Sequence, residues 1–222
     1  KVVAMNLDPI RAEIVRVGRS LFDRRYVHAT AGNISVRLPD AQGFLITPTD
    51  ACLGFLDPAQ LAHVGTDGLQ KSGERASKTL ALHRRIYDAA PAARCVIHSH
   101  STHLVALTLQ GVWSADDIVP PITPYFVMKV GHVPLIPYHR PGDPAAADAV
   151  AERIAQFASR GTPLRAVMLD RLGPNVWHDS PAQAMAVLEE LEETARLWLL
   201  TKALPLSAAQ IEALRVSFGA AW

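Results

Sequence analysis

Residues 95–103 read Cys-Val-Ile-His-Ser-His-Ser-Thr-His, a short apolar run that leads into three histidines. We expect the run to form a buried strand, in which residues two apart point to the same face of the sheet. His98 and His100 would then hold their imidazoles side by side, and neutral imidazole is a common protein ligand for zinc and related metals. The pattern predicts half of a metal site at the edge of a sheet. The alternative is a pair of hydrogen-bonded histidines at a strand end.

The composition fits one large α/β domain or two small ones. The chain has 222 residues, of which 49% are hydrophobic and 19% charged, with a net charge of +1. This balance gives no electrostatic reason to expect nucleic-acid or membrane binding, and no apolar run reaches the length of a membrane span. Cys52 and Cys95 lie in unlike settings and do not indicate a disulfide framework. We therefore expect a soluble, reduced, cytoplasmic protein.

Hydrophobic periodicity predicts alternating strands and helices along the whole chain. The predicted strands span residues 34–38, 43–47, 61–64, 95–100, 133–137, 166–169 and 175–178. The predicted helices span residues 9–26, 77–87, 101–109, 144–157, 181–200 and a final segment from 208. Ser77, Ser180 and Ser207 are predicted N-caps, and Gln210 completes a capping box with Ser207. Mixed strands and helices indicate an α/β layered domain with a central sheet.

Several separated motifs occur in a fixed order along the chain: residues 30–35 (TAGNIS), 46–49 (ITPT), 77–83 (SKTLALH), 98–100 (HSH) and 121–125 (PITPY). Their order resembles the class II aldolase/adducin family. Three further details are most similar to its 3-oxo-tetronate 4-phosphate decarboxylase and fuculose-phosphate aldolase branch: Ser77-Lys78, the run from His100 to His103, and residues 138–144. The resemblance implies a single three-layer αβα domain over residues 1–222, with a central mixed sheet.

The resemblance also implies a mechanism and an assembly. Enzymes of this family use a divalent metal, most often zinc, with manganese, cobalt or iron as alternatives. The metal stabilises the enediolate left when a carbon–carbon bond of a small sugar-acid or phosphosugar substrate breaks, which is Lewis-acid catalysis. Three histidines and a glutamate surround the metal, and a tyrosine from a neighbouring subunit donates a proton. The implied assembly is a homotetramer, with neither nucleic acid nor a membrane as partner.

Carried over by position, the family's roles fall on eight residues of this chain. His98 and His100 match the first two metal ligands, and Tyr125 matches the proton-donating tyrosine, with a packed core or interface tyrosine as the alternative. Asn33, Thr49, Ser77 and Lys78 match the phosphate-binding positions, and Thr79 stands at the catalytic glutamate position. Short polar residues on turns and at a helix N-terminus suit an anion, because exposed backbone amides are available there.

Two of these positions depart from the family pattern. Thr79 cannot act as a carboxylate base, and Leu172 stands where the third metal histidine is expected before Gly173-Pro174. Two histidines make a poor catalytic zinc site, because such sites normally have three protein ligands and one open position. Asp170 lies two residues earlier and would offer an oxygen ligand on the same strand face, further from the histidine pair.

These departures leave two main hypotheses for function. The first is a metal-dependent carbon–carbon lyase, a decarboxylase or aldolase acting on a small phosphorylated sugar acid or keto acid. Thr79 in place of the glutamate is less damaging to decarboxylation than to aldol cleavage, because loss of carbon dioxide needs no base to take a proton from a hydroxyl. The second is a catalytically impaired aldolase-fold protein that serves as a ligand-binding or assembly module. A phosphosugar epimerase ranks below both, because it needs the same metal triad.

Two further sequence features are assigned structural roles. We expect His83 to lie at the edge of the core near the site, and His28 to be a surface or turn residue. Glu189, Glu190, Glu192 and Glu193 are expected to form a solvated acidic face of the long C-terminal helix.

Overall fold

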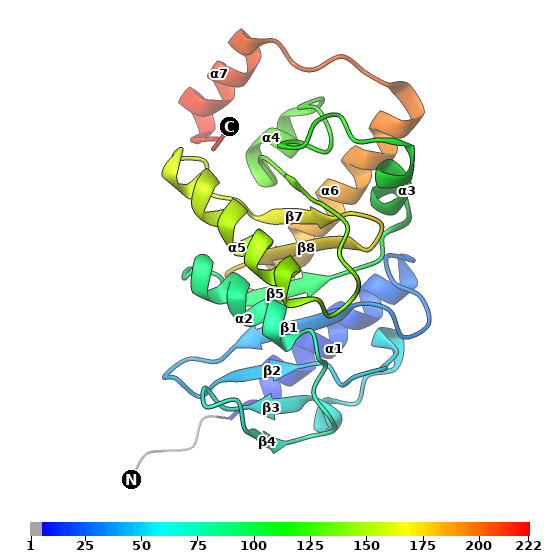
Figure 1. Cartoon of the computed structure of the whole chain (residues 1–222), viewed down its shortest axis with the longest axis vertical. Helices are drawn as coiled ribbons and strands as arrows, with labels where there is room; N and C mark the ends of the chain where they lie inside the picture. The colour runs from blue at the N-terminus through cyan, green and yellow to red at the C-terminus, as the bar shows by residue number, and fades with distance from the viewer. Residues whose placement is uncertain (1–5) are drawn as a thin grey trace.

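The centre of the computed structural model, which describes residues 6–222, is an eight-stranded mixed sheet. Its order is β4-β3-β2-β1-β5-β8-β7-β6 (Figure 1). The strands are β1 (Asn33–Arg37), β2 (Phe44–Ile46), β3 (Ala62–Val64), β4 (Gln70–Ser72), β5 (Cys95–His98), β6 (Leu135–Ile136), β7 (Ala166–Leu169) and β8 (Gly173–His178). The pair β6–β7 is parallel and the other pairs are antiparallel. The predicted α/β class with a central mixed sheet is confirmed.

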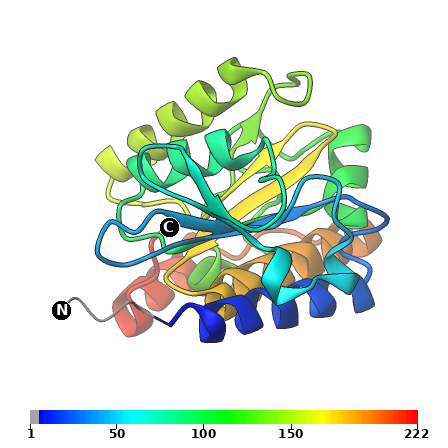
Figure 2. The ribbon, with the colours of Figure 1, turned by 90° about the horizontal axis from the view of Figure 1, so that it is seen from below.

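Helices cover both faces of the sheet. They are α1 (Asp8–Asp23), α2 (Leu80–Ala89), α3 (Thr102–Gln110), α4 (Pro124–Lys129), α5 (Pro144–Ser159), α6 (Pro181–Thr201) and α7 (Ala208–Phe218), with short 3-10 turns η1 (Leu53–Phe55) and η2 (Pro58–Gln60). Seen along the sheet, α5 lies on one side, and α1 and α6 lie on the other (Figure 2). Because both faces are covered, the sequences of the central strands are nearly continuous runs of apolar residues.

Side chains alternate between two cores, one on each face of the sheet. Ile34 of β1, Ile97 of β5 and Val176 of β8 pack with α1, α3 and α6. Val96 and Trp177 point the other way and pack with α2 and α5. This alternation follows from the two-residue period of a strand. It also places every second residue of β1, β5 and β8 under α2, which matters for the polar residues described below.

Most predicted elements are present at close to the expected bounds, and two of the three predicted N-caps are formed. The side chain of Ser180 accepts the Gln183 N–H, and Ser207 forms the predicted capping box with Gln210. Asp143 caps α5 ahead of Pro144. These local signals succeed because a cap needs only residues within one helical turn.

Two local predictions are wrong, and two elements were not predicted. Helix α2 begins at Leu80 after an N-cap at Thr79, although the Ser77 hydroxyl still accepts the Thr79 N–H at 3.4 Å. Strand β5 ends at His98, so His100 lies outside the sheet. The backbone N–H of His100 instead donates to the Tyr26 carbonyl at 3.2 Å, which turns the chain away from β8. The short α4 and the edge strand β4 were not expected, because neither has a clear apolar period.

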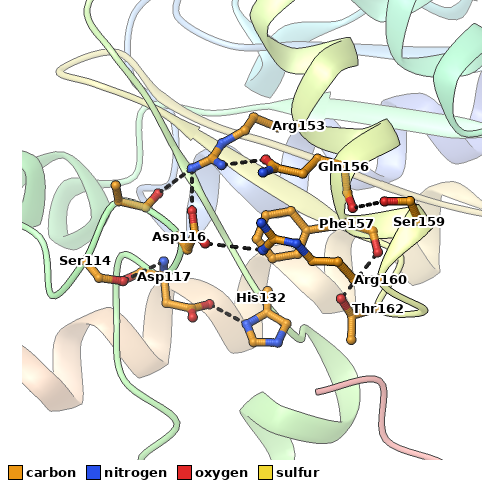
Figure 3. Close-up of polar contacts among 11 residues, drawn as sticks. Ser114, Asp116, Asp117, His132, Arg153, Gln156, Phe157, Ser159, Arg160 and Thr162 are labelled. Atoms are coloured by element: carbon orange, nitrogen blue, oxygen red, sulfur yellow. Dashed lines mark hydrogen bonds and ion pairs between the residues drawn. The ribbon is translucent and has the colours of Figure 1, made fainter.

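The loop between α3 and α4 is held against α5 by charged groups (Figure 3). Asp116 accepts from Arg153 at 2.8 Å and from Arg160 at 3.3 Å. The neighbouring Asp117 bonds the His132 ring at 2.7 Å, and Trp222 stacks on the same ring with centroids 4.0 Å apart. These contacts fix the segment that leads into α4. Within residues 6–222, no helix has both the length and the apolar content to cross a membrane.

Candidate functional site

Three polar residues lie in a row across the middle of the sheet. His98 at the end of β5 pairs with Asn33 of β1 on one side and with Asn175 of β8 on the other. Residues directly opposite in antiparallel strands share a face, so all three side chains point toward the side of the sheet covered by α2. Asn33 and Asn175 are buried, and His98 is partly buried.

The strand ends and the start of α2 meet beside this row. The Ile34 N–H donates to the Thr47 hydroxyl at 3.2 Å, and the Ser77 N–H donates to the Thr47 carbonyl at 3.3 Å. The Thr49 N–H donates to the Arg75 carbonyl at 2.9 Å. The structure therefore brings together the motifs that hold Asn33, Thr49 and Ser77, which are far apart in the sequence.

The N-terminal turn of α2 carries short hydroxyl groups and one free cation. The Ser77 and Thr79 hydroxyls lie 2.8 Å apart, and both residues are partly buried. Lys78 between them is exposed and, within the part of the chain that the structure describes, forms no ion pair. A helix N-terminus with unpaired N–H groups and a nearby ammonium group is suited to an anion.

His98 has the hydrogen bonding of a neutral imidazole with a free nitrogen. Its Nδ1 lies 2.9 Å from the Pro174 carbonyl oxygen, so Nδ1–H donates and Nε2 keeps its lone pair. Burial, together with the nearby His100, lowers the pKa of His98 to about 4. Near neutral pH, His98 is therefore an uncharged proton acceptor at Nε2.

His100 lies beside His98 although it is outside the strand. The two ring centroids are 5.0 Å apart at an angle of 72°. The ring of His28 lies 6.3 Å from that of His100, and burial followed by the nearby His28 lowers the pKa of His100. The sequence did not single out His28, because its approach depends on the loop before β1 and not on spacing to the histidine pair.

The third predicted ligand position is apolar. Leu172 packs against the core under α2 and α5, and it lines a hollow of about 10 Å³ together with Asp170 and His139. No three His, Cys, Asp or Glu side chains between residues 6 and 222 are arranged to hold a metal ion, so Asp170 does not complete the site. The residues present fit two metal ligands and do not fit a three-ligand catalytic site.

Tyr125 stands apart from the other predicted site residues. It follows Pro124 in the first turn of α4, its side chain is 63% exposed, and it forms no hydrogen bond to another described residue. Of the alternative, a packed core or interface tyrosine, the core part is wrong, and the interface part stays a prediction. Its exposure leaves it available to a neighbouring copy.

Two residues near the site were not identified correctly from the sequence. Glu192 is buried, and its carboxylate accepts the backbone N–H groups of His103 at 2.9 Å and Leu104 at 3.1 Å, so it caps α3 from α6. The expected solvated face is therefore wrong for Glu192. Asn175 was placed only within a strand, yet it is fully buried and its Oδ1 has no hydrogen-bond partner among the described residues.

A larger hollow of about 350 Å³ lies at the other end of the sheet, around Gln42, His63, Asp67 and Lys71. It contains none of the predicted site residues. The candidate site is therefore defined by the convergence of polar groups at the ends of β1 and β5 and the start of α2, and not by a deep cavity in the isolated chain.

Comparison with known proteins places this arrangement in a family. Residues 12–199 match the model for the class II aldolase and adducin N-terminal domain. The chain belongs to this family. It is 56% identical over 220 residues to a 3-oxo-tetronate 4-phosphate decarboxylase of Cupriavidus necator, covering 96% of this chain and 97% of that protein. An Escherichia coli protein of the same name is 41% identical over 210 residues, covering 93% and 95%.

Solved structures of class II aldolase-family members share the fold. The crystal structure of YgbL from Escherichia coli has a TM-score of 0.84 and 40% identity, covering 94% of this chain and 98% of that one. The L-fuculose-1-phosphate aldolase of Thermus thermophilus has a TM-score of 0.70 and 27% identity, covering 87% and 95%. The predicted resemblance to the decarboxylase and fuculose-phosphate aldolase branch is confirmed, and decarboxylases are the more similar relatives.

Proposed function

We propose that this protein is a carbon–carbon lyase that acts on a small phosphorylated sugar acid or keto acid, by decarboxylation in preference to aldol cleavage. The observation that carries the proposal is the meeting of Asn33, Ser77 and His98 at one end of the central strands, in a chain similar over nearly its full length to proteins named as decarboxylases. The single-domain organisation of residues 1–222, a homotetramer and a cytoplasmic location are parts of the same proposal.

The phosphate group would lie at the N-terminus of α2. Ser77 and Thr49 would offer their hydroxyl groups, Asn33 would offer its amide nitrogen, and Lys78 would offer a positive charge. These groups are short, fixed by the backbone, and next to the positive end of a helix dipole, which favours a dianion.

The reacting end of the substrate would lie beside His98. When a 3-oxo acid loses carbon dioxide, the electrons of the broken carbon–carbon bond move into an enolate, whose carbon then takes a proton. Neutral His98 would accept a hydrogen bond from a substrate hydroxyl at Nε2, and Tyr125 of a neighbouring copy would donate the proton to the enolate carbon and regain one from solvent. Thr79 would hold the substrate through its hydroxyl, because it cannot act as a carboxylate base.

A divalent metal has only half of its expected ligands here. His98 and His100 would be two ligands, and a metal so held would supply Lewis-acid stabilisation of the enolate. Since no third ligand joins the pair among the described residues, the proposed step uses the side chains alone. A 3-oxo acid loses carbon dioxide more readily than an aldol bond breaks, which supports the decarboxylase form.

The alternative is a catalytically impaired aldolase-fold protein that binds a ligand or assembles with others. The sequence favours this alternative at two positions. Thr79 stands where the family has its catalytic glutamate, and Leu172 stands where it has its third metal histidine. The test is release of carbon dioxide from 3-oxo-tetronate 4-phosphate by the purified protein, with Asn33→Ala and His98→Gln as site variants and His178→Gln as the control. Activity that both site variants lose supports the lyase. Absence of turnover, with phosphate-ligand binding retained, supports the alternative.

A further inference from the structure

A buried chain of hydrogen bonds runs behind Asn33, on the side of the residue away from the proposed ligand. His83 of α2 is fully buried, and its Nε2 lies 2.6 Å from Asn33 Oδ1. Its Nδ1 lies 2.6 Å from the Ser35 hydroxyl, which is 2.8 Å from the Tyr87 hydroxyl. The Tyr87 hydroxyl also lies 3.0 Å from the Ser35 carbonyl oxygen.

The proton positions in this chain follow from what each group can donate. Burial, together with the nearby His98, lowers the pKa of His83 to about 3, so the ring carries a single N–H at neutral pH. Asn33 Oδ1 only accepts, so Nε2–H must donate to it and Nδ1 must accept from the Ser35 hydroxyl. The Tyr87 hydroxyl then donates to Ser35, whose hydroxyl oxygen and carbonyl oxygen both act as acceptors. Every member of the chain is satisfied, as buried polar groups require.

The other end of the Asn33 amide is left free. No acceptor within residues 6–222 bonds Nδ2 of Asn33, while its Oδ1 is held by His83. A free N–H2 group is a donor for an anion, whereas the same amide turned by 180° would present its oxygen and repel one.

We propose that His83 is a positioning residue: through Nε2–H it fixes the Asn33 amide so that Nδ2 faces the ligand and donates to its phosphate. This rests on the proposed function, in which Asn33 binds that phosphate. His83 touches no substrate. It acts by preventing the amide from turning, and Ser35 supports it by holding the ring in the Nε2–H tautomer.

The tautomer of His83 in the wild-type protein is the first test. In ¹⁵N-labelled protein, the ring nitrogens of His83 are identified by the signals that disappear in His83→Gln. The proposal expects Nε2 to carry the proton and Nδ1 to be the acceptor. A ring protonated on Nδ1 would mean that Asn33 donates to His83 and points its oxygen at the ligand, which overturns the proposal. This measurement does not depend on ligand binding.

The second test is a pair of matched variants with inorganic phosphate as the probe. A glutamine amide reaches about as far as Nε2 of histidine, and an asparagine amide about as far as Nδ1. His83→Gln can therefore still donate to Asn33, whereas His83→Asn can bond only Ser35. We expect the phosphate Kd to rise roughly tenfold in His83→Asn and Asn33→Ala, but less than about threefold in His83→Gln. His178→Gln, at the far end of β5 and β8, is the control.

The outcomes separate the two proposals. If Asn33→Ala weakens phosphate binding but both His83 variants bind like the wild type, the positioning role is wrong and the phosphate site stands. If the wild type binds no phosphate, or Asn33→Ala binds as well as the wild type, the proposed phosphate site fails and the role of His83 fails with it. Circular dichroism spectra that match among the variants exclude misfolding as the cause.

Discussion

Gly173 lies so close to Ser99 that a Cβ atom on it would sit 1.9 Å from the Ser99 carbonyl oxygen. Gly173 also has φ +126°, a conformation that residues with side chains rarely adopt. This contact joins the start of β8 to the turn that carries His100, and it fixes the backbone next to Leu172. Backbone packing at this point thus sets the geometry of the candidate site.

Gly173→Ala should destabilise the protein by about 3 kcal/mol or more, because both the contact and the backbone angle oppose a side chain. Gly161→Ala is the matched control, since φ is +76° there but nothing lies within 4 Å of the added Cβ. We expect the control to lose only about 1 kcal/mol. Urea unfolding measures the free energy of unfolding of both variants. An equal decrease in the two would show that the Ser99 contact does not add to the destabilisation.

Glu192→Gln should destabilise the protein by about 1–3 kcal/mol. The carboxylate accepts from the backbone N–H groups of His103 and Leu104, and an amide would turn an N–H2 group toward one of these donors. Burial raises the pKa of Glu192 even so, and the bonds to His103 and Leu104 oppose that rise. Glu193→Gln, on the exposed neighbour, should change the free energy of unfolding by less than about 0.5 kcal/mol. If Glu193→Gln lowered the free energy of unfolding as much as Glu192→Gln, the capping role of Glu192 would be contradicted.

We predict that the folded protein loses stability in acid because His83 is buried and neutral. Its pKa is lowered from 6.5 to about 3, so below pH 6.5 the unfolded chain takes up a proton that the folded protein does not. The stability due to neutral His83 is therefore full above pH 6.5 and falls as the pH drops toward 3. Between pH 6.5 and 5 the loss is on the order of 2 kcal/mol.

The check is chemical unfolding of wild type and His83→Gln at several pH values. The wild type should lose more stability than the variant on acidification, because glutamine does not titrate. His98, whose pKa is also lowered, contributes a similar slope to both proteins and cancels in the comparison. Parallel pH curves would contradict a neutral, buried His83.

Lys78→Ala should weaken binding of inorganic phosphate roughly three- to tenfold, because it removes the positive charge nearest the start of α2. The exposed Lys129 at the end of α4 provides the control, as Lys129→Ala removes the same charge elsewhere. Raising the salt concentration should reduce the difference between wild type and Lys78→Ala. Equal affinities for the two lysine variants would place the phosphate somewhere other than the start of α2.

The sequence predicts those parts of the fold and site that depend on neighbours in the chain. Strand alternation in β1, β5 and β8 and the caps at Asp143, Ser180 and Ser207 are set within a few residues. The order of separated motifs was sufficient to indicate the family, which the match over residues 12–199 then showed.

The remaining features depend on partners that are distant in the sequence. Glu192 lies in an acidic run that looks solvated, and only the arrival of α3 from 89 positions away buries it. The bond from His83 to Asn33 spans 50 positions and has no local signal. His100 was expected in a strand, but its backbone bonds Tyr26 and not β8, so the side-by-side rings arise from a turn.

The most direct measurement is the metal content of the purified protein by elemental analysis, with Leu172→His measured alongside. His98 and His100 form an incomplete ligand pair, and Leu172 stands at the position where the third histidine is expected. We predict less than about 0.1 metal ion per chain in the unmodified protein and about one per chain in Leu172→His. About one tightly held zinc, manganese, cobalt or iron ion per unmodified chain would contradict it.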